Sequence, residues 1–166
     1  MTRTTVRTQV LLLAFIFSFQ LIFAGIPPTN NDNCANATSL TIGVTQANET
    51  VKNMNPSTGM PVPCSGDPDD DVWYKFTPTS GLATISLSSI GTDLSSSGAM
   101  IQMFTGSCGS LSSYACGTTT LTTVVQSGTA YYIRIYSAGT SPIGSTSGGS
   151  AFSITATSLT IPANDD

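Results

Sequence analysis

The sequence lacks the residue types on which most catalytic centres depend. It contains no histidine among its 166 residues, so neither a Ser-His-Asp triad nor a Cys-His pair can form. It also has no glycine-rich phosphate loop followed by lysine. Paired carboxylates hydrolyse glycosides from opposed sides of a cleft, whereas four of the nine acidic residues here share one short run. We therefore expect a protein without catalytic residues.

That acidic run is the strongest candidate for a metal site. Asp67, Asp69, Asp70 and Asp71 lie close together, and a proline bends the chain between them. Calcium binds about six to eight oxygen atoms from carboxylates and carbonyls, which such a loop could supply. Alternatively, the charges keep an exposed edge soluble, or Asp71 ties the loop to the next strand through backbone N–H groups. Calcium is thus the one cofactor that the sequence suggests.

The four cysteines, Cys34, Cys64, Cys108 and Cys116, indicate disulfide bonds rather than zinc binding. A structural zinc site needs closely spaced ligand pairs, and the chain has neither such a pair nor a histidine. Four cysteines can pair in three ways. A bond between Cys108 and Cys116 could close a hairpin, which would leave Cys34 with Cys64. Because disulfides persist in oxidising compartments, the cysteines agree with an exported protein.

Aromatic residues on two expected strands suggest a binding surface. Side chains alternate between the two faces of a strand, so Trp73 faces outward if its neighbours face the core. The same alternation places Tyr132, Arg134 and Tyr136 on one face of a later strand. These four residues could stack on sugar rings or anchor a protein partner. Alternatively, a loop such as residues 53–64 folds over the rings, or Trp73 fills a gap in the core.

Composition and charge exclude several kinds of partner. Charged residues make up 8% and hydrophobic residues 40% of the chain, a balance too apolar for a disordered protein. The formal net charge is -4, and it becomes -6 without Arg3 and Arg7 near the N-terminus. So few cations cannot neutralise a nucleic-acid backbone or an anionic membrane surface. We therefore expect neither nucleic acid nor a membrane as a partner of the mature chain.

Residues 1–25 are predicted to be a signal peptide. Two arginines precede an apolar stretch at residues 10–24, and Ala24 and Gly25 are small enough for cleavage. The stretch is short for a bilayer span, which needs about 20 residues. An uncleaved anchor helix is the alternative. The signal peptide predicts a secreted or cell-surface protein.

The elements that must position these residues are strands. Serine, threonine and glycine dominate the composition and favour strands and turns over helices. Glycine or proline separates nearly all the apolar runs, and no apolar stripe at helical spacing follows residue 26. Roughly eight strands in one domain suit a jelly-roll-like β-sandwich of two packed sheets. The expected strands are residues 39–42, 47–52, 72–77, 82–87, 100–104, 121–125, 131–136 and 151–157.

We divide the chain into a signal peptide (1–25), a linker (26–33), a β-sandwich domain (34–158) and a second linker (159–166). Residues 162–166 resemble residues 28–33, which precede the first cysteine. The repeat predicts that a further module follows and that downstream domains are partners. The alternative is chance, because asparagine and aspartate are common in linkers.

Four motifs, at residues 31–37, 71–77, 104–111 and 128–135, together resemble the bacterial pre-peptidase C-terminal-like (PPC-type) domains. The resemblance covers about residues 30–158. It implies a jelly-roll-like sandwich without catalytic residues of its own, beside secreted proteases, glycan-degrading enzymes and adhesins. It also supports the pairing of Cys34 with Cys64 and of Cys108 with Cys116.

The function predicted from the sequence is that of a non-catalytic extracellular accessory module. Such a module binds or positions a polymeric substrate or partner, glycan or protein, within a larger secreted or surface protein. The alternative is a structural or adhesive spacer domain. If the aromatic residues bind a glycan, the substitution Trp73→Ala should abolish that binding.

Overall fold

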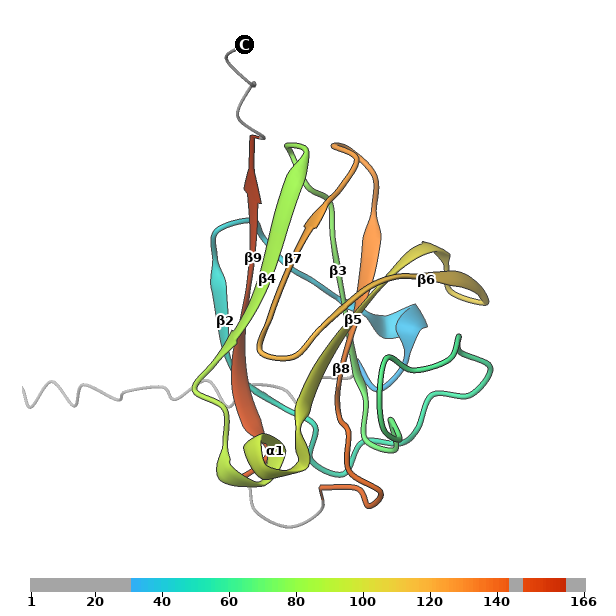
Figure 1. Ribbon diagram of the computed structural model, residues 1–166, viewed down its shortest axis with the longest axis vertical. Coiled ribbons are helices and arrows are strands. Elements are labelled where there is room, and N and C mark those ends of the chain that lie inside the picture. The colour runs from blue at the N-terminus through green and yellow to red at the C-terminus, as the bar shows by residue number, and fades with distance from the viewer. Residues whose placement is uncertain (1–30, 144–147, 161–166) are drawn as a thin grey trace, which may run out of the picture.

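The strands expected from the alternation of side chains form two packed β-sheets (Figure 1). The computed structural model describes residues 31–143 and 148–160. Sheet A has the strand order β1-β3-β8-β5-β6, and sheet B has the order β2-β9-β4-β7. The strands are β1 (Thr38–Ser39), β2 (Thr45–Thr50), β3 (Val72–Phe76), β4 (Leu82–Ser88), β5 (Ala99–Ser107), β6 (Ser110–Gly117), β7 (Thr120–Val124), β8 (Tyr131–Ser137) and β9 (Ala151–Leu159). The predicted all-β sandwich is therefore confirmed, whereas the signal peptide lies outside the described residues.

Three elements of the structure were not expected from the sequence. Strand β6 is mostly exposed and lacks an alternation of apolar and polar residues. Helix α1 (Thr92–Ser97) is too short to show a helical period, as is the single turn of 3-10 helix η1 (Cys34–Asn36). In the described ranges, no helix is long and apolar enough to cross a membrane.

The core lies between the sheets and follows the predicted alternation. Val72, Tyr74 and Phe76 of strand β3 point inward and are 0 to 3% exposed. The other central strands contribute Ala83, Ile85, Leu87, Ala99, Ile101, Met103, Tyr131, Ile133, Ile135, Phe152, Ile154 and Ala156 to the same cluster. Because side chains alternate along each strand, the intervening residues of the two sheets face away from this core.

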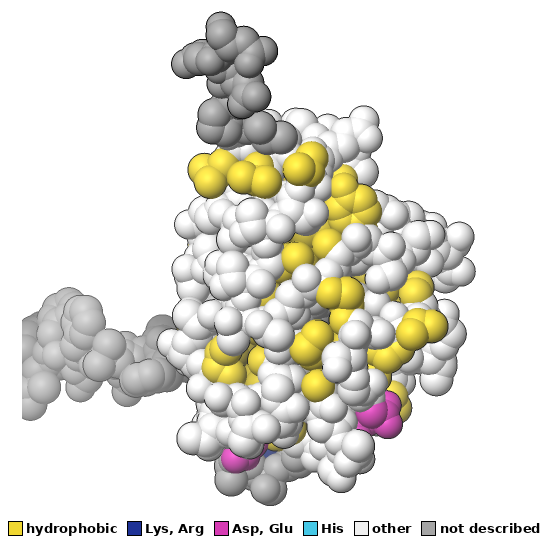
Figure 2. Space-filling model, viewed as in Figure 1, with side chains coloured by type: hydrophobic (Ala, Val, Ile, Leu, Met, Phe, Trp, Pro, Cys, Tyr) yellow, Lys and Arg dark blue, Asp and Glu magenta, His cyan; other side chains and the backbone are white. Residues whose placement is uncertain are grey.

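The outer faces of the two sheets differ in what covers them. Sheet B presents threonine and serine, whose hydroxyls pair between strands, as in Thr45 with Thr155 at 2.8 Å and Thr84 with Thr122 at 2.9 Å. Charged side chains are sparse on the face seen in Figure 2, and apolar ones form small groups. The outer face of sheet A instead carries large side chains, and residues 52–71 lie across it (Figure 1). We call this segment the strap.

The disulfides pair Cys34 with Cys108 and Cys64 with Cys116, so the expected pairing was wrong. Cys108 lies in the turn of the β5–β6 hairpin, whereas Cys116 lies farther along β6, opposite Gln102. The seven residues from Ser110 to Cys116 span roughly 20 Å of extended strand, which places Cys116 too far from Cys108 for a disulfide bond. The observed pairs have Cα–Cα distances of 5.6 and 5.9 Å. They tie the hairpin to the N-terminal segment and to the strap.

Candidate functional site

The predicted aromatic row lies on the outer face of sheet A, but the strap covers it. Trp73 and Tyr136 are 0% exposed and Arg134 is 1% exposed, while Tyr132 is partly buried. Trp73 donates a hydrogen bond from Nε1 to Ser57 Oγ at 2.8 Å. The expectation of an exposed binding surface was therefore wrong, and a covering loop accounts for the burial. Trp73 also packs on Cys34, Ala37 and Phe104 in a small second core.

Arg134 joins sheet A to the end of the strap. Its guanidinium lies 5.1 to 5.7 Å from the ring centres of Trp73, Phe104 and Tyr136. It pairs with the Asp71 carboxylate at 3.4 Å and donates a hydrogen bond to the side chain of Gln102. Ring faces and one carboxylate compensate in part for removing the charge from water. The arrangement is that of a buried structural contact rather than of a site open to ligands.

The strap has three further attachments to sheet A. Gln102 Nε2 donates to the backbone oxygen of Val62 at 2.9 Å. The Tyr136 hydroxyl donates to the backbone oxygen of Ser65 at 3.0 Å and accepts from the N–H of Ser65 at 3.3 Å. The Cys64–Cys116 disulfide lies between these contacts along the strap. The middle of the strap is therefore fixed although it has no regular secondary structure.

The acidic run does not assemble a metal site. The Asp70 carboxylate accepts hydrogen bonds from the N–H and hydroxyl of Ser137, both at 2.9 Å, and from the N–H of Ile143 at 3.1 Å. Asp71 accepts a hydrogen bond from Ser57 at 2.8 Å and pairs with Arg134. In the described part of the chain, no group of three or more His, Cys, Asp or Glu side chains could hold a metal ion. The calcium site expected at Asp67, Asp69, Asp70 and Asp71 is thus not formed, because the buried carboxylates are used as internal acceptors.

Burial changes the protonation of the internal carboxyl groups. The pKa of Asp71 is raised from 3.8 to about 6, mainly because burial disfavours the charged form. Burial also raises the pKa of Asp70 and that of Glu49, whose carboxylate accepts a hydrogen bond from the Tyr74 hydroxyl at 2.7 Å. Glu49 follows a bulge in β2 at Asn48, where φ is 62°. These acids serve the fold, and none of them lines either of the two pockets described next.

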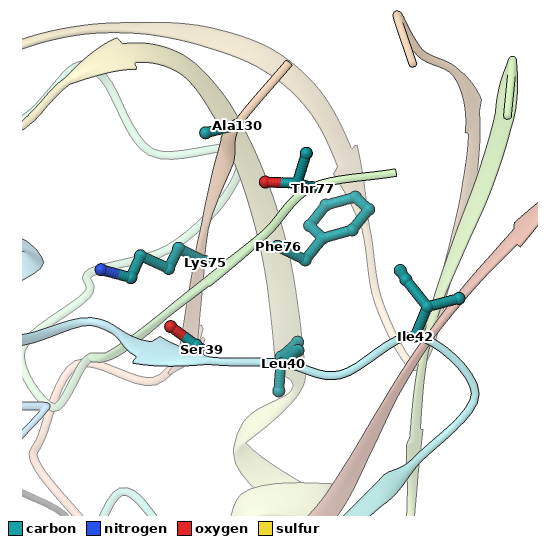
Figure 3. Close-up of a pocket in the computed structure, with 7 residues that line it drawn as sticks. All are labelled: Ser39, Leu40, Ile42, Lys75, Phe76, Thr77 and Ala130. Carbon is teal, nitrogen blue, oxygen red and sulfur yellow. The ribbon is translucent and has the colours of Figure 1, made fainter. Parts of the chain in front are cut away.

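An open pocket of about 310 Å³ lies at the edge of sheet A (Figure 3). We call it the edge pocket, and its lining residues are Ser39, Leu40, Ile42, Lys75, Phe76, Thr77 and Ala130. It forms because β1 pairs with β3 over only two residues before the chain crosses to sheet B. Leu40 and Phe76 are buried, whereas Lys75 and Thr77 are exposed. In Figure 3 the Lys75 side chain extends away from the Phe76 ring and Ile42.

A second pocket, of about 260 Å³, lies between the N-terminal segment and the strap. We call it the strap pocket, and it is lined by Asp32, Asn33, Cys34, Asn55, Pro56, Ser57, Thr58 and Met60. The Asp32 carboxylate accepts hydrogen bonds from the backbone N–H and side-chain amide of Asn55, at 2.6 and 2.8 Å. Carboxylate, amide and hydroxyl groups without a basic residue suit an uncharged ligand with several hydroxyls.

Neither pocket was predicted from the sequence. Each is assembled from segments far apart in the chain, so no local motif marks its lining residues. Lys75 offered the one available signal, since it is one of only three basic residues after the expected signal peptide.

Comparison with protein families matches residues 30–147 to a family described as galactose binding domain-like and associated with T9SS, the type IX secretion system. The match spans more than half of the chain. A search of curated proteins finds no match. The family is a β-sandwich family, as the fold requires, and the narrower resemblance to PPC-type domains stays a prediction. The chain belongs to the T9SS-associated family of galactose-binding-domain-like domains.

Proposed function

We propose that this chain is a non-catalytic accessory domain of a secreted or cell-surface protein, where it binds or positions a polymeric glycan or protein. The family match over residues 30–147 carries this proposal, because the family is described as galactose binding domain-like and as associated with a secretion system. Two disulfides support export, since such bonds persist in oxidising compartments. The PPC-type resemblance supports the same role beside secreted enzymes and adhesins.

The proposed ligand is either a glycan or a protein, and each of the two open pockets suits one of these ligands. The strap pocket offers carboxylate, amide and hydroxyl groups and has no basic lining residue, so we assign it to a neutral glycan. The edge pocket has an apolar floor and a lysine, so it suits a protein partner rather than a neutral glycan. The predicted glycan surface around Trp73 is not part of the proposal, because the strap covers it.

A glycan array probed with the purified protein tests the glycan form. Thr58 is exposed in the strap pocket, so the substitution Thr58→Arg should block the pocket without disturbing the core. Thr120, on strand β7, is also an exposed threonine, and Thr120→Arg is the matched control. We expect Thr58→Arg to abolish binding and Thr120→Arg to retain it. Equal binding by both variants would exclude the strap pocket.

The alternative function, a structural or adhesive spacer, is favoured by one observation. The aromatic side chains best suited to stack on sugars are buried beneath the strap. A spacer predicts no ligand on glycan or peptide arrays, and no effect of either pocket variant on adhesion of the full-length surface protein. Trp73→Ala no longer distinguishes the two functions, because Trp73 belongs to a core and its loss would unfold the covering strap.

A further inference from the structure

The edge of sheet A leaves backbone hydrogen-bonding groups open beside β3. On this side of the strand, Trp73 N–H donates to the backbone oxygen of Asn31, and the Lys75 oxygen accepts from Leu40 N–H, both at 2.8 Å. Backbone groups alternate in direction along a strand, so the N–H and C=O of Thr77 point to the same side. Among the described residues, neither group of Thr77 has a hydrogen-bond partner. One donor and one acceptor are thus available where β1 has left the sheet.

The floor of the edge pocket is apolar and small. Leu40 and Phe76 are 6% and 3% exposed, and Ile42 packs against the main core beside them. A volume of about 310 Å³ is close to the lower limit for ligand pockets, roughly 300 Å³. It accommodates one side chain rather than a chain of sugar rings. The buried Phe76 offers no open ring face for stacking on a sugar.

Lys75 gives the pocket its charge. It is the only charged residue in the lining, it is exposed, and it makes no ion pair with any described residue. An unpaired ammonium group at the rim favours a partner that carries a carboxylate. The chain as a whole has a net charge of -4 and would repel an acidic partner elsewhere, so the attraction is specific to the position of Lys75.

From these features we infer that the edge pocket binds an extended, acidic peptide segment of a protein partner. The peptide backbone pairs with Thr77 beside β3, beyond the two residues where β1 pairs with that strand, as in strand addition to a sheet edge. One apolar side chain of the peptide enters the edge pocket against the partly buried Ile42, and a carboxylate pairs with Lys75. The inference rests on the proposed binding function and names a protein as the polymer.

An octapeptide array tests this inference with the whole protein as the probe. Each peptide alternates valine and threonine around one glutamate, and a matched peptide has glutamine in its place. We expect the glutamate peptides to bind more strongly, and Lys75→Glu to weaken their binding about tenfold or more in fluorescence anisotropy. Lys52→Glu is the matched control, because Lys52 lies outside the edge pocket, and it should change affinity less than about twofold.

A backbone variant separates strand addition from side-chain attraction. Thr77→Pro removes an N–H that has no partner in the free protein, so the melting temperature should not change while peptide binding weakens. Thr77→Ser keeps the N–H and should bind as the parent does. If Thr77→Pro fails to fold, the pair of lysine variants still decides the question.

Four results would overturn the inference. Equal binding of glutamate and glutamine peptides, or undiminished binding by Lys75→Glu, would exclude recognition by the edge pocket. Lys75-dependent binding to uronic-acid polysaccharides without peptide binding would replace the peptide by an acidic glycan and leave the proposed function intact. Absence of binding on both the peptide and the glycan arrays would count against the proposed function as well.

Discussion

Replacing both Cys64 and Cys116 by serine should release the middle of the strap. Their disulfide joins residues 52 positions apart in the sequence, for which the chain-entropy model gives about 4 kcal/mol. That figure is an upper limit, because Cys34–Cys108 closes an overlapping loop with a separation of 74. The hydrogen bonds of Ser57, Val62 and Ser65 to sheet A remain. We therefore expect a loss of about 2–4 kcal/mol with the sandwich still folded.

The chain contains one tryptophan, which makes the strap directly observable. Trp73 is 0% exposed and its indole N–H is bonded to Ser57 of the strap. In the Cys64→Ser/Cys116→Ser variant we expect red-shifted emission, stronger quenching by acrylamide and a lower urea midpoint. Hydrogen exchange should become faster in residues 60–66. The companion variant, Cys34→Ser/Cys108→Ser, should instead loosen the N-terminal segment around η1.

Two results would refute this reasoning. One is a non-reducing peptide map of the parent protein that joins Cys108 to Cys116. The other is a Cys64→Ser/Cys116→Ser variant whose free energy of unfolding and acrylamide quenching both match those of the parent. The second result would mean that hydrogen bonds alone hold the strap.

Three further predictions concern buried acids and one glycine. Burial raises the pKa of Asp71 from 3.8 to about 6, so the folded state holds this proton more tightly than the unfolded state does. The free energy of unfolding should therefore fall by up to about 3 kcal/mol as the pH rises from 3.8 to about 6. Urea unfolding at pH 4 and pH 7 checks this, and a stability that increases with pH contradicts it. Asp70→Ala leaves three hydrogen-bond donors buried without their acceptor and should cost at least about 1–3 kcal/mol in the same assay. Gly66 has a φ of +67°, and the Cβ of an alanine there would clash with the backbone oxygen of Ala138. Gly59 also has a positive φ but has open space around it, so the Gly66→Ala variant should melt at a much lower temperature than the Gly59→Ala variant.

The alternation of side chains was enough to predict the core but not the outer faces. Val72, Tyr74 and Phe76 face inward as expected, because period two fixes which residues share a face. Whether the opposite face meets water depends on the strap, whose path has no periodicity and is set by long-range contacts such as Cys64–Cys116. The alternation therefore predicts that Trp73 lies outside the main core, but it does not predict that Trp73 is buried in a second core.

The wrong disulfide pairing has a related cause. Strand β6 was not recognised, because Ser110–Gly117 is an edge strand whose residues are mostly exposed and unpatterned. Without that strand, the sequence places Cys116 near the hairpin turn that contains Cys108. Placing β6 in register with β5 moves Cys116 opposite Gln102 and makes the strap its nearest covering segment.

Burial of the outer face of sheet A removes that face as a surface for the proposed binding. The inner faces form the core, and the strap closes the face that carries the large aromatic and basic side chains. Recesses then remain where the chain enters or leaves a sheet: at the edge pocket after β1, and at the strap pocket beside the N-terminal segment. Lys75 and Thr58 are exposed there and lie outside both cores. A loss of binding in Lys75→Glu or Thr58→Arg can therefore be interpreted as a lost contact with the ligand, whereas the same loss in Trp73→Ala would report unfolding of the strap.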